Sequence, residues 1–338
     1  MSQLPLSTTH PGNLAATDRS TDDSRARLDV LEGIAAQLID RCRAAGATQA
    51  EVSASQEHGL NVNVRMGAVD TVESTRDRGI AVTVYFGKRK GSASTADLRE
   101  ESLASTVEQA CAIARHTEDD PAAGLADPAL MAHDLLEFDS WHPWDIDADR
   151  ALDIALACEQ AGRDADARIE NSDGASVGSS ESMSVYANSH GFVGRERSTQ
   201  HTIGCALIAG RGDAMQRDGW YSTAIAAGDL ETAAAIGQHA ALRAASRLQP
   251  RSVATTEVPV LFAAEVARSL IGHLLGAVSG GALYRRASFL VDSVGTQLFP
   301  DWFDIRENPF LMRGFRSSSF DSEGVATRAS SLIEKGVL

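Results

Sequence analysis

The sequence predicts an α+β fold, with an N-terminal α/β region built from two similar units and an incomplete, β-rich C-terminal domain. Segments with apolar residues at helical spacing are separated by segments in which apolar and polar residues alternate, and the order helix, strands, helix occurs twice. A further observation predicts the second part, because the sequence pattern changes at about residue 256 and the chain is strand-like and rich in Phe after the Gly pair at 280–281.

The first unit is predicted over residues 28–120. Its opening stretch, LDVLEGIAAQLIDRCRAA, has the apolar spacing of an amphipathic helix and ends at Gly46. Alternating runs follow, which indicate strands joined by short turns; the first contains Leu60, Val62 and Val64. The stretch LREESLASTVEQACAIARHT then returns to helical spacing and closes the unit.

The second unit, residues 146–250, repeats this order. Helical spacing in residues 147–166 precedes strand-like segments with Gly-rich turns, and helical spacing returns at 229–248. Between the units, residues 121–145 carry Pro and Gly and are predicted to form a linker. Because a sheet buries an apolar face under helices, each unit is expected to be a helix-covered sheet.

The two ends of the chain are expected to differ from these units. Residues 1–27 are polar and rich in Ser, Thr and Asp, which predicts a disordered tail. Near the other end, EVPVLF is predicted to be a strand, and residues 263–278 a helix that ends near a Gly pair. We therefore expect the C-terminal domain to occupy residues 256–338 and to stop unfinished.

Composition limits the classes of function. A net charge of −15 argues against a general nucleic-acid surface. The sequence has neither an uncharged apolar run of about 18 residues nor a secretory signal pattern, so we expect a cytoplasmic protein without a membrane span. The four cysteines are far apart and form no C-x-x-C pair, which favours buried thiols over a zinc cluster or disulfide framework.

The stretch FAAEVARSLIGHLLGAVSGG, residues 262–281, comes closest to catalytic chemistry. Glu265 and His273 are separated on a straight helix by about 80° of rotation and about 12 Å of rise, so they cannot share one metal ion. A lone His on an apolar helix is more often a packed residue than a metal ligand. Glu265 is expected to be a charge near the helix N-terminus, where it favours the helix dipole.

The C-terminal third contains the pieces GHLLGAVSGG, YRRASFLVDS, LFPDWF and FDSEGVATR. These pieces resemble the TldD/PmbA family, often described as modulators of DNA gyrase, and stand almost as its PmbA (TldE) branch has them. A weaker resemblance reaches back to about residue 28. The resemblance implies an N-terminal α/β region, a barrel-like β domain and paired subunits. Family members continue well past EKGVL, so we interpret the chain as C-terminally truncated.

The resemblance also bears on the metal helix. TldD-type chains carry H-E-x-x-x-H, with zinc held by the two His and by a further ligand near the C-terminus. Aligned on the Gly-His pair, this chain reads Arg268-Ser269-Leu270-Ile271-Gly272-His273, so only His273 remains as a ligand-type residue. Arg268 stays protonated and cannot bind zinc, and Ser269 cannot replace a carboxylate base. We therefore expect no catalytic residue, metal or cofactor in this chain.

A function follows from the resemblance. The chain would be a non-catalytic PmbA/TldE-like subunit of a cytoplasmic zinc metallopeptidase, either paired with a TldD-type, zinc-bearing subunit or present as a homo-oligomer. Its substrates would be unfolded peptides, in roles such as microcin-precursor maturation and antitoxin degradation, without direct contact to nucleic acid or membrane. Two alternatives stay open. One is an autonomous metal-dependent hydrolase that uses His273 with ligands such as His201 or His239, and the other is a peptide-binding adaptor without proteolytic context.

Overall fold

The computed structural model describes the backbone from Leu14 to Leu338 and the side chains from Asp23 onward. Its contacts form two compact units, which we describe separately. Unit 1 comprises the described residues up to Gln249 together with Pro309–Arg328, and unit 2 comprises Pro250–Asn308 and Ala329–Leu338. The domain boundaries expected from the sequence stay predictions.

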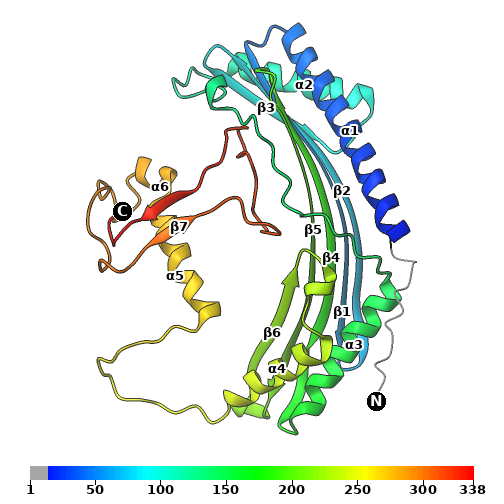
Figure 1. Cartoon of the computed structure of the whole chain (residues 1–338), viewed down its shortest axis with the longest axis vertical. Helices are drawn as coiled ribbons and strands as arrows, with labels where there is room; N and C mark the ends of the chain where they lie inside the picture. Colours follow the sequence, from blue (N-terminus) through cyan, green and yellow to red (C-terminus); the bar gives the residue numbers. More distant parts are fainter. Residues whose placement is uncertain (1–13) are drawn as a thin grey trace, which may run out of the picture. The chain divides into compact units, whose positions relative to one another are not determined.

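Unit 1 contains one large antiparallel sheet and the helices that cover it (Figure 1). Its strands are β1 (Gln49–Arg65), β2 (Ala68–Phe86), β3 (Arg89–Thr95), β4 (Ile169–Asn188), β5 (Val193–Ala209) and β6 (Gln216–Ala224). Its helices are α1 (Leu14–Ala44), α2 (Glu100–His116), α3 (Ala148–Ala165) and α4 (Ala233–Ser246), with short 3₁₀ helices at Pro128–Leu130, Gly212–Ala214 and Ala227–Asp229.

The six strands follow the order β3-β2-β1-β4-β5-β6, so each predicted helix–strands–helix unit supplies three neighbouring strands. The two halves join where β1 pairs with β4 along Glu51–Val64. The predicted α+β class is therefore confirmed, and the two units share one continuous sheet instead of forming separate ones.

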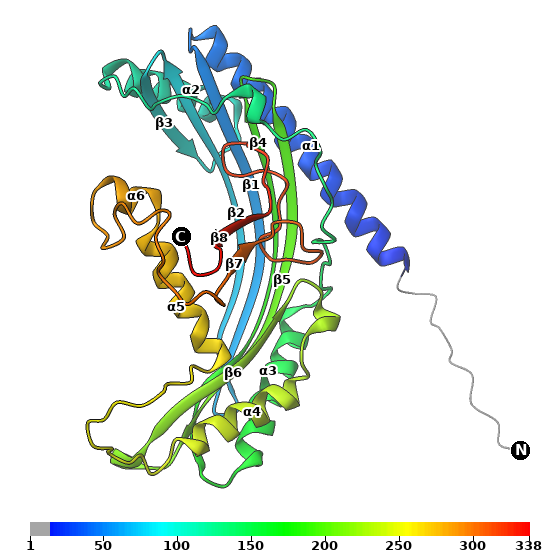
Figure 2. The same ribbon diagram turned by 60° about the vertical axis from the view of Figure 1, so that its left-hand side comes forward.

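All four α-helices of unit 1 cover the same face of this sheet, as Figures 1 and 2 show. One apolar core lies under α1 and α2 and includes Leu38, Val82 and Val185. A second core lies under α3 and α4 and includes Val62 and Leu207. Burial of each such side chain stabilises the fold by about 1.5–3 kcal/mol, because its apolar surface leaves water.

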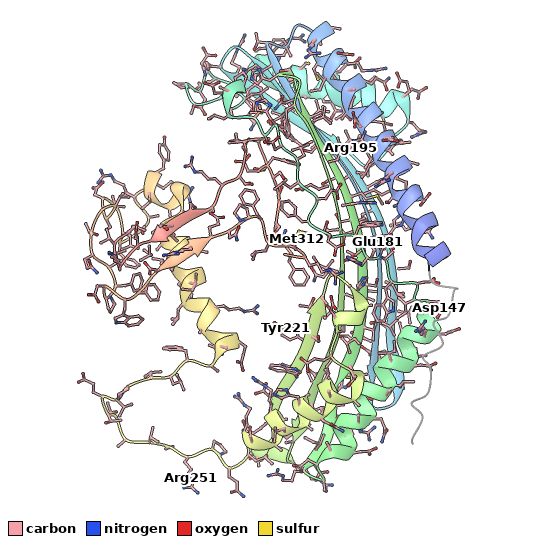
Figure 3. The ribbon with its side chains drawn as sticks, viewed as in Figure 1. Asp147, Glu181, Arg195, Tyr221, Arg251 and Met312 are labelled. Carbon is pink, nitrogen blue, oxygen red and sulfur yellow. The ribbon has the colours of Figure 1, made fainter. Side chains whose placement is uncertain are left out.

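Local signals fix where α3 begins. The side chain of Asp147 accepts a hydrogen bond from the backbone N–H of Arg150 and thereby caps the first turn (Figure 3). Further along α3, the Glu159 carboxylate is only 1% exposed and accepts the backbone N–H groups of Met66 and Gly67, at 2.8 and 2.7 Å. A helical side chain therefore holds the turn between β1 and β2.

The extent of α1 corrects one expectation from the sequence. Residues 14–27 were predicted to belong to a disordered tail, but α1 already begins at Leu14; residues 1–13 lie outside the described residues. This part of α1 contacts the sheet through polar groups. Arg27 donates to Gln56 and contacts His58, and Ser24 accepts a hydrogen bond from Arg197. Apolar spacing could not reveal such contacts, because none of them is apolar.

Unit 2 contains helices α5 (Ala264–Ala277) and α6 (Gly280–Tyr284) and the short strands β7 (Ile305–Glu307) and β8 (Ser330–Ile333). Its small core is built around Leu274, Leu290 and Ile333. The helix predicted at 263–278 is present. The strand predicted for EVPVLF is wrong, because residues 257–262 form no regular element and no strand pairs with them within the described part of the chain.

Candidate functional site

Helix α5 carries the residues that the sequence singled out, and its geometry does not assemble them into a site. Arg268 and His273 are five residues apart, which is about 140° of rotation on an α-helix, so the two side chains leave different sides of α5. Both are exposed, as is Ser269, whose hydroxyl donates to the Val266 carbonyl at 2.7 Å. The sequence favoured a packed His273. In the structure His273 is exposed, and the neighbouring Leu274 is buried instead.

A zinc ion does not fit these residues. The guanidinium of Arg268 carries a permanent positive charge and has no free lone pair, and a neutral serine hydroxyl is a poor ligand beside imidazole, thiolate or carboxylate. Across the described part of the chain, no group of three or more His, Cys, Asp or Glu side chains could hold a metal ion. His273 is therefore not part of such a group among the residues that the structure describes.

The other two candidate histidines lie in unit 1 and have structural roles there. His201, on β5, is fully buried; its Nε2 lies 2.9 Å from the His142 carbonyl oxygen and its Nδ1 lies 3.0 Å from the Ser179 hydroxyl. Burial lowers the pKa of this imidazole, so the ring is kept neutral. His239 stacks on the Trp220 ring with the ring centroids 4.0 Å apart. Both ring nitrogens of His201 are thus engaged within the protein.

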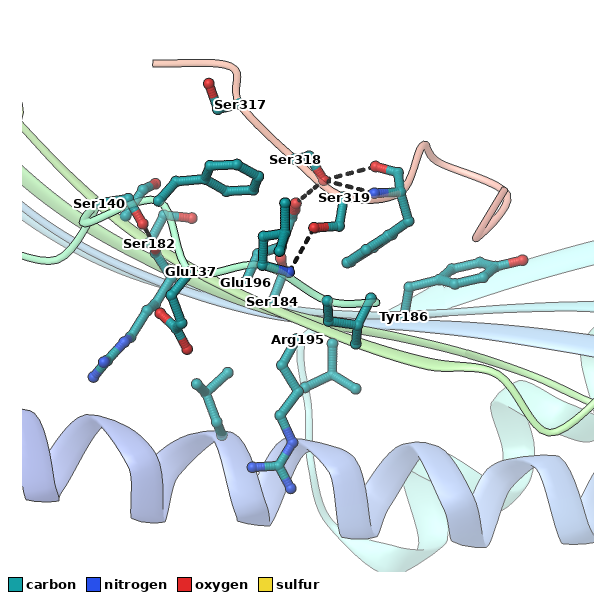
Figure 4. A pocket seen from close by; sticks show the side chains of 18 of the residues that line it. Glu137, Ser140, Ser182, Ser184, Tyr186, Arg195, Glu196, Ser317, Ser318 and Ser319 are labelled. Atoms are coloured by element: carbon teal, nitrogen blue, oxygen red, sulfur yellow. Dashed lines mark hydrogen bonds between the residues drawn. The ribbon is translucent and has the colours of Figure 1, made fainter. Parts of the chain in front are cut away.

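A hollow of unit 1 at the edge of β5 has a volume of about 1140 Å³. We call it the edge cavity. It is bounded by α1, by β4 and β5, by residues 135–140 and by residues 314–322 (Figure 4). Nine serines line it, namely Ser53, Ser140, Ser182, Ser184, Ser198, Ser317, Ser318, Ser319 and Ser322.

The wall of the edge cavity beside α1 is charged. Arg195 of β5 forms an ion pair with Asp29 at 2.7 Å and another with Glu32, both on α1. Two residues further along β5, the Arg197 guanidinium lies over the Trp141 ring, 5.7 Å from its centroid. The ion pairs fix the Arg195 side chain against α1, and Trp141 covers that of Arg197.

The opposite wall is formed by residues 314–322, which pack on the other face of the sheet. The Phe320 ring lies against Gly194; a Cβ at this glycine would come within 2.4 Å of the ring. The Ser318 hydroxyl donates to Glu196, and the Leu136 N–H donates to the Ser319 hydroxyl at 2.8 Å (Figure 4). The wall therefore joins β5 to the segment that runs along its edge.

Tyr186 closes the end of the edge cavity without being reactive. Its hydroxyl donates to the Glu51 carboxylate at 2.8 Å, and Tyr85 donates to the other oxygen of Glu51 at 2.9 Å. Burial, and then the hydrogen bond to Glu51, raises the pKa of the Tyr186 phenol, so it stays protonated. The cavity contains hydroxyl groups and paired charges, which suits binding better than catalysis.

Reasoning from the sequence did not find the edge cavity. Its walls come from segments near residues 28, 137, 195 and 318, which are far apart along the chain. The only available signal was the frequency of serine in β4 and in the stretch RSSSF, which does not indicate that these residues meet.

Comparison with known proteins identifies the family. Models of the PmbA/TldA metallopeptidase match in three parts: domain 1 at residues 50–114, the central domain at 141–248 and the C-terminal domain at 255–338. The metalloprotease PmbA homolog of Haemophilus influenzae is 40% identical over 321 residues, which cover 95% of this chain and 71% of that protein.

The chain belongs to the PmbA/TldD metallopeptidase family. Another relative, the metalloprotease PmbA of Escherichia coli O157:H7, is 44% identical over 289 residues. The match covers 86% of this chain and 64% of the E. coli protein, so the chain spans slightly less than two thirds of that relative.

Solved structures show the same fold. A proposed modulator of DNA gyrase from Bacteroides thetaiotaomicron superposes with a TM-score of 0.83 at 24% identity, over 91% of this chain and 70% of that one. TldE from Thermococcus kodakarensis superposes with a TM-score of 0.72 at 18% identity, over 90% and 68% of the respective chains. At these identities the likeness concerns the fold of the PmbA/TldD family and not the reaction.

Proposed function

We propose that this PmbA/TldD family chain is a non-catalytic subunit of a zinc metallopeptidase that degrades or processes unfolded peptides. The observation that carries the proposal is the metal helix. Where the resemblance implies a zinc ligand and a base, α5 has Arg268 and Ser269. A cation at the ligand position would repel zinc, and a serine hydroxyl is not a general base near neutral pH without a partner.

The proposal includes a partner and a location. A TldD-type subunit would supply the zinc, and the complex would be cytoplasmic, a heteromer in the leading form and a homo-oligomer in the alternative. Precursor maturation and antitoxin degradation are the proposed kinds of role. Among the described residues, no helix is both long enough and apolar enough to cross a membrane.

Zinc content after purification tests the proposal. We expect no stoichiometric zinc in the chain after dialysis, measured by elemental analysis. Addition of a TldD-type relative should give a complex that contains zinc and cleaves an unfolded casein fragment, because the relative supplies the metal site. About one zinc per isolated chain that is lost in His273→Ala would contradict the proposal.

A matched variant sharpens this test. Arg268→His with Ser269→Glu restores the ligand and the base on α5, and His273 is already present. We still expect weak zinc binding and no peptidase activity, because two ligands hold zinc less well than the three protein ligands usual in catalytic sites. Tight zinc binding by this double variant, measured by calorimetry, would show a third ligand within the chain and favour an autonomous hydrolase.

A further inference from the structure

The edge of β5 is free over part of its length, and this free part lies in the edge cavity. β5 pairs with β4 from Val193 to Ala209, whereas β6 covers its other side only from His201 onward. Among the residues that the structure describes, the stretch Val193–Gln200 therefore has a neighbouring strand on one side alone. Val193, Arg195 and Arg197 from this stretch line the cavity.

The backbone direction follows from the contacts just beyond this point. The Thr199 N–H donates to the Ser140 carbonyl at 2.9 Å, and the Ser140 hydroxyl donates to the Arg197 carbonyl at 2.7 Å, so the backbone groups of both β5 residues point away from β4. Because this direction alternates along a strand, the N–H and C=O groups of Val193 and Arg195 also point outward. These outward groups face the edge cavity.

The chain's own segment occupies only one end of this edge. Residues 140–142 contact Arg197 and Thr199, while Leu136 contacts Ser319 on the far wall instead of β5. The space between this segment and Val193–Arg195 belongs to the edge cavity. The cavity is thus a slot with a strand edge on one side, and its volume is that of a site for a peptide segment or a comparable ligand.

We propose that the edge cavity binds an extended peptide segment as an added strand beside Val193–Arg197 of β5. Outward N–H and C=O groups at alternate residues are recognised by another extended backbone, which is how strand addition provides affinity. The inference deepens the proposed function and rests on it for the class of substrate, an unfolded peptide.

The walls indicate which peptide side chains would fit. Successive side chains of an added strand point to opposite faces of the sheet. One set would meet the serine hydroxyls of Ser182, Ser184 and Ser317, which can donate or accept hydrogen bonds. The other set would meet α1, where Arg195 is already paired with Asp29 and Glu32. Small or polar side chains are therefore favoured, and recognition rests mainly on the peptide backbone.

The test measures binding to the purified full chain by fluorescence anisotropy. The probe is a labelled, capped peptide of about ten residues made of Val, Thr and Ser, and its twin carries an N-methyl group on every residue. The side chains are the same in both peptides, but the twin cannot donate backbone hydrogen bonds along either edge. We expect the parent to bind and the twin to bind about tenfold more weakly or not at all.

Variants locate the binding edge. Arg195→Pro removes the outward N–H, and proline is tolerated on an edge strand. It is compared with Arg195→Ala, which removes only the ion pairs. We expect Arg195→Pro to raise the Kd about tenfold above that of Arg195→Ala. Ser74→Pro, at an outward-facing position on the free edge of β2, is the control and should leave the Kd unchanged.

Each other outcome overturns the proposal. Failure of the parent peptide to bind would contradict the proposal. Equal Kd values for the parent and its N-methylated twin would contradict it as well. Equal Kd values for Arg195→Pro and Arg195→Ala would place the peptide elsewhere, and an equal loss in Ser74→Pro would show a general effect of proline. If Arg195→Pro does not fold, the Kd values of the two peptides for the unmodified chain still test the proposal. Zinc content tests the subunit role separately, so the two failures can be told apart.

Discussion

The sheet of unit 1 has two partly free edges, and they differ in their surroundings. Within the described part of the chain, β3 pairs with β2 only over Ile80–Phe86. Ala68–Arg78 of β2 therefore has a strand on one side alone, as has Val193–Gln200 of β5. Every residue of that β2 stretch is exposed. The free stretch of β5 instead lies between α1 and residues 314–322.

This difference indicates how an edge becomes a binding site. Free edges invite pairing with other chains, and proteins protect them with charged side chains. The β2 stretch is protected in this way by four exposed charged residues, Glu73, Arg76, Asp77 and Arg78. On β5 the charge of Arg195 is turned towards α1 and neutralised there, so the backbone stays available inside a cavity.

The largest effect we expect concerns the turn that leads into the free edge of β2. Glu159→Ala removes the carboxylate that accepts the N–H groups of Met66 and Gly67. The turn would lose both hydrogen bonds and a cavity would remain where the buried carboxylate was, so we expect a loss of about 3 kcal/mol in the free energy of unfolding. Urea unfolding and hydrogen exchange of residues 60–75 measure it.

The control for this change is Glu231→Ala on the protein surface, where the loss should be well under about 1 kcal/mol. The free part of β5 should keep its exchange protection in Glu159→Ala. Equal loosening at Val193–Gln200 would show that the two edges are not independent, and the comparison between them would fail.

An intermediate effect is expected at the wall of the edge cavity. Gly194→Ala places a Cβ within 2.4 Å of the Phe320 ring, so residues 314–322 must shift away from β5. We expect a loss of about 2 kcal/mol in stability, because overpacking forces neighbouring groups to move. Hydrogen exchange should rise in residues 314–322.

The matched control is Gly79→Ala on β2. The nearest atom to its Cβ is the Ser55 hydroxyl at 3.5 Å, which is an ordinary contact. Stability should therefore change little in this variant. If Gly194→Ala lowers the free energy of unfolding no more than Gly79→Ala does, residues 314–322 do not form a fixed wall. The two edges would then resemble each other more than the structure indicates.

The smallest effect concerns pH and the end of the β5 edge. Burial lowers the pKa of His201 below its usual value near 6.5, so the folded state binds this proton less readily than the unfolded state does. The contribution of neutral His201 to the free energy of unfolding is therefore complete above pH 6.5 and declines as the pH falls below it. Because His201 contacts the His142 carbonyl, residues 140–144 should loosen first.

Urea unfolding between pH 7.5 and 5 checks this sign. His201→Gln should be less stable at neutral pH and should show a flatter dependence on pH, because glutamine does not titrate. The unmodified chain, measured in the same buffers, is the control. An unchanged slope in His201→Gln would mean that other groups cause the acid sensitivity.

Much of the local structure could be predicted from the sequence. Helical spacing gave the apolar part of α1, and alternation gave β1 and β2, because these patterns depend on neighbours within one element. The first half of α1 was missed because its contacts to Gln56, His58 and Arg197 are polar. The predicted strand at 257–262 failed because an apolar run needs a partner strand before it can form one.

By itself, the sequence determined the family, the repeated order of helices and strands, and the chemistry of α5. Arg268 and Ser269 decide that chemistry through their own functional groups, in any tertiary arrangement. The tertiary structure alone decided which strands became neighbours, and hence that β5 has a free edge. It also brought α1, residues 135–140 and residues 314–322 around that edge. Strand order is set by packing between distant segments, and no local pattern encodes which backbone groups stay unpaired.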